Sequence, residues 1–338
     1  MRYYILLFIT LILISCQDEI TLALPQAENK LVVEGAIEPG FPPYVILTNN
    51  QGYFESIDEN TYNNLFVNDV DSVMVWFFDD AGEKIKINLE KISGLDSLPP
   101  IYTDLEYFNN PLNYSFSQQE KTYFLEIHWN NKIISSFTTI PRATPLDCLW
   151  VEQSDVTTDN EFKCEIRAMY SDPVNEQNNI LIRSKRTVHY EQEDSLICSN
   201  KNTPDFNLKL VDSGSDVLIN GESFETYFPR PKGNGFPTGK YNSFRTKNCD
   251  DGTDLVFPED IVLIKFCQID EPSLKFWRGL VRQAGNNGNP FAEPLNLVSN
   301  IDGGLGVWTG YSPVYYKVPI VIDTTIFDQY FPEIIDIF

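Results

Sequence analysis

Cys16 is the residue whose surroundings point most clearly to chemistry, because a thiol is the most nucleophilic common side chain. It follows Arg2 and an apolar run over residues 3–14, with the small residue Ser15 directly before it. A positive charge, a short apolar core and small residues at its end are the parts of a secretory signal peptide. The run is shorter than the about 20 residues that a membrane-spanning helix needs. The sequence therefore predicts a signal peptide over residues 1–15.

The ending Leu13-Ile14-Ser15-Cys16 is similar to the lipobox of bacterial lipoproteins. This resemblance implies that a diacylglyceryl group is attached to the thiol, that the chain is cut before Cys16, and that the new amino terminus receives a fatty acid such as palmitate. Three acyl chains exceed the two signals that stable membrane anchoring requires. We therefore expect lipidation at Cys16 and a lipidated tether over residues 16–29. The alternative is an ordinary signal peptide with a chance cysteine.

The residues after the cysteine are Gln17, Asp18 and Glu19. An acidic pair at this place resembles the export signal with which Bacteroidota lipoproteins reach the outer face of the outer membrane. The resemblance implies a protein anchored by lipid in the outer membrane and facing the cell exterior. The alternative is that these residues only begin a solvated linker.

The composition describes a packed, acidic protein. The chain has 338 residues, which suggests two domains of ordinary size, and its 42% hydrophobic and 13% aromatic residues argue against disorder. The formal net charge is −23. Such a charge repels nucleic acids and anionic lipid headgroups, so neither is an expected partner.

Five cysteines follow Cys16, and the predicted compartment permits disulfides. Cys198 and Cys249 lie in polar, turn-rich sequence and are the candidate pair, whereas Cys148, Cys164 and Cys267 lie in strand-like runs and read as buried free thiols. No C-x-x-C motif occurs and the chain has two histidines, so a structural zinc site is not expected.

Known catalytic patterns are missing from the sequence. It contains neither the G-x-x-x-x-G-K-[ST] phosphate loop nor the G-x-S-x-G motif of serine hydrolases. His128 and His189 lie in strand-like segments and read as surface or cross-strand residues. Residues 249–254 carry oxygen ligands at a spacing loosely like a calcium loop, but they lack its bidentate glutamate and read as an exposed turn. We therefore predict no catalytic residues, no metal and no cofactor, although scattered carboxylates leave a glycosidase-like pair open.

Short apolar runs separated by turn residues fill residues 30–140. Runs of this length without helical periodicity indicate an antiparallel, immunoglobulin-like β-sandwich. Asn130-Asn131 and the glycine-containing turn at residues 79–83 are hairpin signals. Residues 93–115, rich in Pro, Asn and Tyr, read as a long surface excursion. The predicted strands are residues 31–35, 44–48, 73–78, 85–89, 122–129 and 133–138.

Two prolines within residues 138–145 favour a stiff connector, and a second β-rich domain, sandwich or barrel-like, is predicted for residues 146–325. Its strongest strand is residues 255–268. One amphipathic helix is predicted near residues 271–284, with Asp270 as its N-cap and Gly285 as its end. The C-terminal tail, residues 326–338, reads as a final strand or a docking segment.

A pattern near the C-terminus carries a family resemblance. Asn289-Pro290-Phe291, Val298-Ser299-Asn300-Ile301 and Asp302-Gly303-Gly304-Leu305-Gly306-Val307-Trp308 occur in this order, after residues 30–40 and Ser171-Asp172-Pro173. Together they resemble the Bacteroidota lipoprotein family called domain of unknown function 4249, from about Cys16 to about Tyr311. Members are typically encoded beside TonB-dependent outer-membrane receptors. The resemblance implies a role in nutrient uptake as a substrate-capturing partner of such a receptor, and it carries over no catalytic residue.

The glycine run is the candidate ligand or partner contact. Gly303, Gly304 and Gly306 permit positive φ angles or close backbone approach after a strand. One interpretation is a tight turn or bulge that lets Trp308 fold into the core. The other is the lip of a ligand cleft, with the side chains of Phe291, Trp308 and Tyr311 as stacking surfaces.

Three functions stay open at this point. The first is a non-enzymatic surface lipoprotein that helps a TonB-dependent transporter capture an unknown nutrient. The second is a surface hydrolase acting on glycans or peptides, and the third is an adhesive β-sandwich protein. The abundance of aromatic residues fits all three, because aromatic side chains serve cores, stacking sites and interfaces alike.

Overall fold

The structure is a computed structural model. It describes residues 28–50, 65–92, 100–153, 164–174, 176–189, 202–204, 208–215, 221–228, 244–248, 254–258, 260–285, 296–320 and 325–337. The predictions for Cys16, Gln17, Asp18, Glu19, Cys198, Cys249 and Phe291 lie outside these residues.

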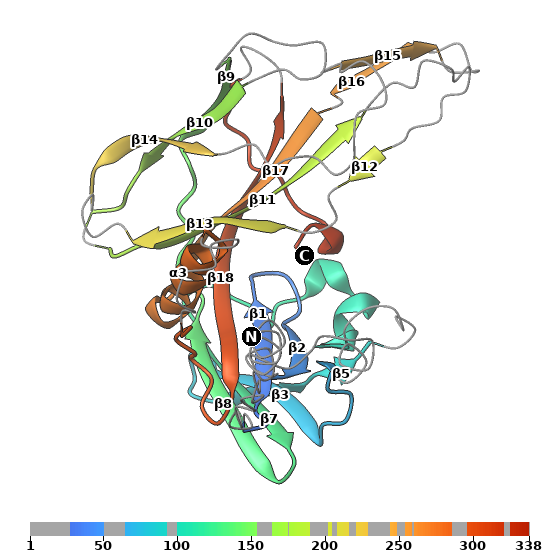
Figure 1. The fold of residues 1–338 in the computed structure, drawn as a ribbon, viewed down its shortest axis with the longest axis vertical. Coiled ribbons are helices and arrows are strands. Elements are labelled where there is room, and N and C mark those ends of the chain that lie inside the picture. The colour runs from blue at the N-terminus through green and yellow to red at the C-terminus, as the bar shows by residue number, and fades with distance from the viewer. Residues whose placement is uncertain are drawn as a thin grey trace, which may run out of the picture.

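The largest sheet runs through the whole molecule (Figure 1). Its strands lie in the order β12-β11-β17-β18-β1-β2-β6-β5, and β13 also pairs with β11. The bounds are β1 Leu31–Ile37, β2 Tyr44–Asn49, β5 Glu90–Lys91, β6 Ile101–Thr103, β11 Asn179–His189, β12 Asn202–Pro204, β13 Lys209–Ser215, β17 Asp260–Ile269 and β18 Leu305–Pro319.

Three smaller sheets complete the β-structure. One has the order β4-β3-β7-β8, a second the order β14-β10-β9-β19, and β15 and β16 form a hairpin. Their bounds are β3 Ser72–Phe78, β4 Lys84–Asn88, β7 Thr122–Trp129, β8 Lys132–Thr139, β9 Cys148–Gln153, β10 Cys164–Ser171, β14 Ser223–Phe228, β15 Phe244–Asn248, β16 Asp254–Pro258 and β19 Thr325–Ile326. The helical elements among the described residues are α3 Glu271–Gly285 and the 3₁₀ turns η1 Leu105–Asn109, η2 Pro111–Asn113 and η3 Ile334–Asp336.

The β7–β8 hairpin shows how local sequence makes these strands. Residues alternate between buried and partly exposed along β7, so one face packs on the core. The turn residues Asn130 and Asn131 both have positive φ angles, of 50° and 58°. Asparagine tolerates this left-handed backbone, which matches the twist of a two-residue hairpin.

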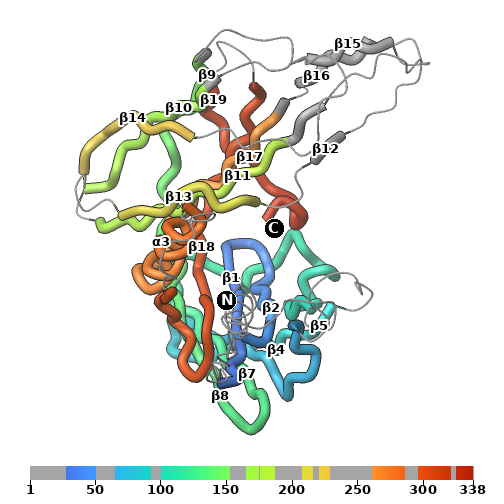
Figure 2. Tube along the Cα trace, in the orientation of Figure 1, coloured from blue at the N-terminus to red at the C-terminus, as the bar shows by residue number. Residues whose placement is uncertain are grey.

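Strand β18 joins the two halves of the molecule (Figures 1 and 2). Its first part, Leu305–Gly310, pairs with β1 in parallel, and its second part, Tyr311–Pro319, pairs with β17 in antiparallel. The parallel pair departs from the antiparallel pattern expected for the first sandwich. It brings the last long strand of the chain against the first.

The two main cores lie on either side of the predicted connector. The first runs from Leu31 to Ile140 and also contains Ile301 and Trp308, whereas the second runs from Leu146 to Ile320. Side chains from the predicted second domain therefore help to fill the core of the first.

The predicted helix is α3, and its N-cap ties it to the first half. The Asp270 carboxylate accepts a hydrogen bond from the Ser273 N–H at 3.0 Å, which satisfies one of the open donors at the helix start. Its other oxygen accepts from the Thr138 hydroxyl at 2.7 Å and from the Thr139 N–H at 3.0 Å. Trp277 and Leu274 are buried and pack the helix against the sheet.

The mainly β fold class and a sandwich-like arrangement are confirmed, without a closed barrel in the described parts of the chain. The segment predicted as one strand over residues 255–268 forms β16 and then β17. Pro258 ends β16, since proline lacks the N–H that a continuing ladder needs. The predicted tail forms η3 after the short strand β19.

Candidate functional site

The glycine run lies where β18 crosses β1 and β8. A Cβ on Gly306, whose φ is +102°, would lie 2.0 Å from the Val33 carbonyl oxygen, and one on Gly304 would lie 2.9 Å from the Leu31 carbonyl oxygen. Gly303 has a φ of +76°, and its Cβ would meet the Ile133 carbonyl oxygen at 3.2 Å. The three glycines therefore permit close backbone packing.

Trp308 is fully buried and belongs to the first core. Its ring lies against Gly35, where an added Cβ would be 2.7 Å from the Trp308 Cε3 atom. The indole Nε1 donates to the Tyr123 carbonyl oxygen at 3.3 Å. The Asn300 side chain accepts a hydrogen bond from the Trp308 N–H at 2.9 Å and donates one to the Trp308 carbonyl oxygen at 2.8 Å. This geometry corresponds to the interpretation in which the turn folds Trp308 into the core, rather than to a stacking surface.

Tyr311 is buried in a different cluster, under α3. Arg183 Nη2 donates to the Tyr311 hydroxyl at 3.3 Å, and the Arg183 guanidinium lies 4.6 Å from the centre of the Trp277 ring. Burial raises the pKa of Tyr311, although Arg183 opposes this shift. The structure thus separates Trp308 and Tyr311 into two cores and does not bring them together at one cleft.

The described free cysteines fit the same picture of packing. Cys267 is buried and Cys148 is partly buried, and neither forms a disulfide. Burial raises the pKa of the Cys267 thiol to about 12, so this group stays protonated at neutral pH. It is an inert core residue rather than a nucleophile.

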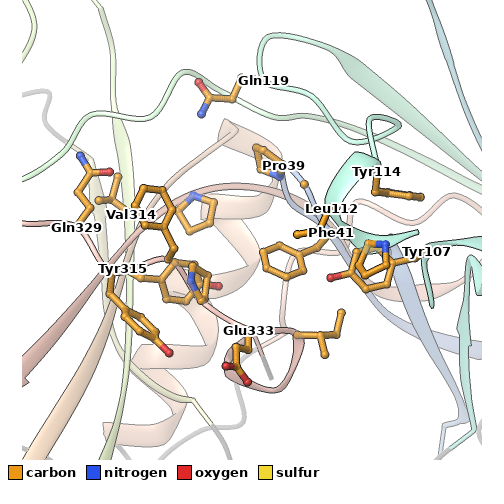
Figure 3. Close-up of a pocket in the computed structure, with 17 residues that line it drawn as sticks. Pro39, Phe41, Tyr107, Leu112, Tyr114, Gln119, Val314, Tyr315, Gln329 and Glu333 are labelled. Atoms are coloured by element: carbon orange, nitrogen blue, oxygen red, sulfur yellow. The ribbon is translucent and has the colours of Figure 1, made fainter. Parts of the chain in front are cut away.

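A pocket of about 440 Å³ lies between the two halves, away from the glycine run. Four segments that are distant in the sequence form its walls, namely residues 39–41, 107–119, 313–315 and 329–334. Figure 3 shows Val314 and Tyr315 on one side of it, Tyr107 and Tyr114 on another, and Glu333 at its edge. Six aromatic residues line it: Phe41, Tyr107, Tyr114, Tyr315, Tyr330 and Phe331.

A buried ion pair stands behind one wall. Glu38 and Lys265 are 4% and 2% exposed and form a salt bridge between the end of β1 and the middle of β17. The Tyr315 hydroxyl donates to the second Glu38 oxygen at 2.8 Å. Burial and the neighbouring Glu38 charge raise the pKa of Tyr315 well above its usual value, so the hydroxyl remains a donor.

The C-terminal tail forms another wall of the pocket. The Tyr330 N–H donates to the Tyr315 carbonyl oxygen at 2.7 Å, and the Tyr330 hydroxyl donates to Asp336 at 2.9 Å. Asp336 also pairs with Lys185 at 3.1 Å. The side chain of Ile337 is 4% exposed and packs in a small cluster with Leu263 and Tyr315. The tail is therefore docked on the body by apolar and ionic contacts.

The sequence does not predict this pocket, because no single segment contains it. One signal was available: prolines and aromatics cluster at residues 39–43, 107–114 and 330–332. Taken alone, each cluster is typical of a turn, a surface excursion or a tail. Their shared composition of rigid, apolar residues is typical of ligand-site linings.

A second exposed feature lies on the outer face of the β4-β3-β7-β8 sheet. The rings of Trp76 and Phe124 stack at 4.0 Å with an interplanar angle of 10°, and the Lys84 ammonium lies 3.9 Å from the Trp76 ring centre. Phe78 and Phe137 flank this pair and are 51% and 57% exposed. We call these five residues the outer aromatic face. Its four aromatic side chains are of the residue types that are enriched at protein–protein interfaces.

His128 lies at the end of this sheet and bonds Glu126 at 2.7 Å. Within the described residues, no group of three or more His, Cys, Asp or Glu side chains could hold a metal ion. None of the helices in the described part of the chain has the length and apolar character of a membrane span. What the pocket can do chemically is bind, by stacking and by hydrogen bonding at its rim.

No curated protein matches the chain. A protein-family model, described as Domain of unknown function (DUF4249), matches residues 17–316. This range spans both halves of the fold, from the segment before β1 to the middle of β18. The chain therefore belongs to the DUF4249 family.

Proposed function

We propose that this chain is a surface-exposed outer-membrane lipoprotein that captures a nutrient ligand and passes it to a TonB-dependent transporter, without an enzymatic step. The observation that carries the capture role is the aromatic pocket. Six aromatic side chains from four segments line a cavity of about 440 Å³. This volume lies within the roughly 300–1,000 Å³ of small-molecule sites.

The anchor is the signal-peptide cysteine. Under this proposal Cys16 carries the acyl chains, Gln17-Asp18-Glu19 directs export, and residues 16–29 tether the folded part to the outer membrane. Mass spectrometry of the mature protein should find a lipidated Cys16, and protease treatment of intact cells should degrade the protein. A bare thiol, or complete protection from protease, would contradict the anchor and the localisation.

The outer aromatic face is the proposed contact with the transporter. Monomeric proteins rarely leave large apolar patches exposed, and such patches often mark interfaces. A sugar needs a free ring face for stacking, but Phe124 and Lys84 cover the two faces of Trp76. These contacts favour a protein partner over a glycan on this surface.

The test is affinity purification of the lipoprotein from detergent-solubilised outer membrane. A TonB-dependent receptor should be recovered in a stoichiometric amount. The double change Phe78→Ser and Phe137→Ser should reduce its recovery at least about tenfold, because truncating central aromatic contacts typically costs 1 kcal/mol or more each. Phe108→Ser is the matched control, since Phe108 is 52% exposed but lies on η1. Recovery of the lipoprotein without a receptor would exclude the partnership.

A further inference from the structure

We propose that the aromatic pocket binds an organic cation, that is, an ammonium or guanidinium group carried on an apolar or aromatic body. This inference deepens the proposed capture role and rests on it only in taking this pocket as the ligand site. It concerns the chemical class of the ligand, and it does not depend on the anchor or on the transporter.

The charge of the lining is the first reason. Glu333 is the only charged residue among the described residues that line the pocket, and its side chain is exposed at the edge. Among the described residues that line the cavity there is no lysine, arginine or histidine. Within this described lining, an anionic ligand would therefore meet no counter-charge, whereas a cation would meet a carboxylate.

The second reason is a set of carboxylates behind the wall that accept hydrogen bonds from its tyrosines. Three of the lining tyrosines donate their hydroxyl protons to carboxylates: Tyr114 to Asp104 at 3.0 Å, Tyr315 to Glu38 at 2.8 Å and Tyr330 to Asp336 at 2.9 Å. A hydroxyl that donates to a carboxylate gains electron density, which makes its ring a better partner for a cation. The pocket is thus surrounded by electron-rich rings.

These hydroxyls remain protonated. Burial, followed by the charge of Asp104, raises the pKa of Tyr114, and burial with the Asp336 hydrogen bond raises that of Tyr330 to about 12. The tyrosines therefore act as neutral rings with negative faces at neutral pH, and not as acids that could supply or accept a proton.

Two lysines near the wall each neutralise one carboxylate behind it. Lys265 pairs with Glu38, and Lys185 pairs with Asp336. Asp104 is 7% exposed, and among the described residues it receives hydrogen bonds but forms no ion pair. Among the described residues, neither Asp104 nor Glu333 forms an ion pair, and Lys317, over the Tyr330 ring, is the other cation near this wall. In a partly enclosed site the attraction of these two carboxylates for a ligand cation is stronger than in water.

The wall already binds ammonium groups of the protein itself. The Lys265 ammonium lies 5.4 Å from the Tyr315 ring centre, and the Lys317 ammonium lies 5.4 Å from that of Tyr330. Both distances fall within the about 6 Å range of cation–π contacts. The remaining aromatic residues of the wall, which include Phe41, Tyr107 and Phe331, provide the same kind of surface to a ligand. The net charge of −23 adds a long-range field that steers cations toward the molecule.

A matched pair of probes tests the inference. Tyramine and 3-(4-hydroxyphenyl)propionate share one phenol ring and a two-carbon link, but one ends in an ammonium and the other in a carboxylate. We expect the purified mature protein to bind tyramine about tenfold more tightly at neutral pH in ligand-observed NMR titrations, from cation–π contacts and one carboxylate. The preference should weaken with added salt.

Two pairs of variants locate the effect. Glu333→Gln should reduce the preference for tyramine to about threefold, whereas Glu83→Gln, at the exposed β3–β4 turn, should leave it unchanged. Phe331→Ala should weaken the binding of tyramine, whereas Phe327→Ala should not, because Phe327 is exposed in the same tail but does not line the pocket. All four side chains are exposed, so the variants should fold.

Two results would overturn the inference in different ways. If the propionate binds as tightly as tyramine and Phe331→Ala weakens both, the pocket is a ligand site but not one for cations. If neither probe binds, the pocket fails as an aromatic ligand site, and the capture role fails with it. The partnership with a transporter would still be decided by the affinity purification.

Discussion

At the scale of single residues, the buried pair of Glu38 and Lys265 shows how charge is used inside this molecule. Removing two charges from water costs several kcal/mol, and their attraction offsets this cost only when the remaining hydrogen bonds are satisfied. Tyr315 supplies one of these bonds to Glu38. The pair joins the end of β1 to β17, and it therefore fixes the position of one pocket wall.

Lys265→Met should lower the free energy of unfolding by about 3–5 kcal/mol, because it leaves the Glu38 carboxylate buried without its partner. The double change Glu38→Gln with Lys265→Met should recover most of this loss in urea unfolding followed by circular dichroism. Lys275→Met is the control: its pair with Glu271 is exposed, so the change should cost less than about 1 kcal/mol. Equal losses for the single and double variants would show that the charge pair is not the cause.

Gly306→Ala is expected to be costly for a steric reason. The new Cβ would lie 2.0 Å from the Val33 oxygen at a φ of +102°. Strain of about 1–3 kcal/mol and overpacking of about 1–3 kcal/mol add to a loss of roughly 2–6 kcal/mol. Gly82 has a similar φ of +81° but open space around it. Thermal unfolding of Gly82→Ala should therefore show a loss of stability of only about 1–2 kcal/mol. A loss of stability as small as this for Gly306→Ala would contradict the close contact between β18 and β1 at this residue.

At the scale of elements, the C-terminal tail is the segment on which the pocket depends most. It forms one wall through residues 329–334, and it is held by the Asp336–Lys185 pair, the Tyr330 hydroxyl and the buried Ile337. Burial alone would raise the pKa of Asp336, but hydrogen bonds from Tyr330 and Lys185 lower it below its usual value.

Because the folded pKa of Asp336 is lowered, its ionised form stabilises the docked tail. This contribution is complete above the unfolded pKa of 3.8 and is lost as the pH falls through the lower folded value. The protection of the residue 330–337 amides, meaning their exchange rate relative to the intrinsic rate at each pH, should therefore fall below pH 3.8 before that of the β1 amides does. In Asp336→Asn the tail should already be less protected at neutral pH, and its protection should depend less on pH. If the tail of this variant exchanges as in the wild type, the Asp336 carboxylate does not hold the tail on the body.

At the scale of the whole molecule, β18 makes the two halves depend on each other. Its first part lies beside β1 and places Trp308 in the first core, and its second part lies beside β17 in the other half. The halves also share the Asp270 cap, which bonds α3 to β8. Loss of one half should remove a strand and a core side chain from the other.

A fragment of residues 28–145 should therefore not fold alone, although it contains nearly all of the first core. It lacks Ile301 and Trp308, and its β1 strand loses a partner. Circular dichroism should show no cooperative thermal transition for the fragment. Adding a peptide of residues 296–312 should produce a cooperative thermal transition of the fragment, whereas the same peptide with Trp308→Ala should not. A sharp transition of the fragment by itself would show an independent domain.

Much of the secondary structure was readable from the sequence because its causes are local. The alternation along residues 122–129, the Asn130-Asn131 turn and the Asp270 cap each act within a few positions. The sequence predicts one strand over residues 255–268, where the structure has β16 up to Pro258 and β17 from Asp260. The sequence also left two interpretations of the glycine run open, because a glycine that permits a cleft looks the same as one that permits close packing.

The sequence by itself determined the mainly β architecture, the helix, the acidic surface and the family, because these depend on residue types and short-range periodicity. Only the tertiary structure decided which aromatics are core and which line a pocket. Trp308 is buried by Gly35, 273 positions earlier, and Tyr315 meets Glu38, 277 positions earlier. Contacts of this separation are set by how the sheets close on one another, and short-range sequence patterns do not record that closure.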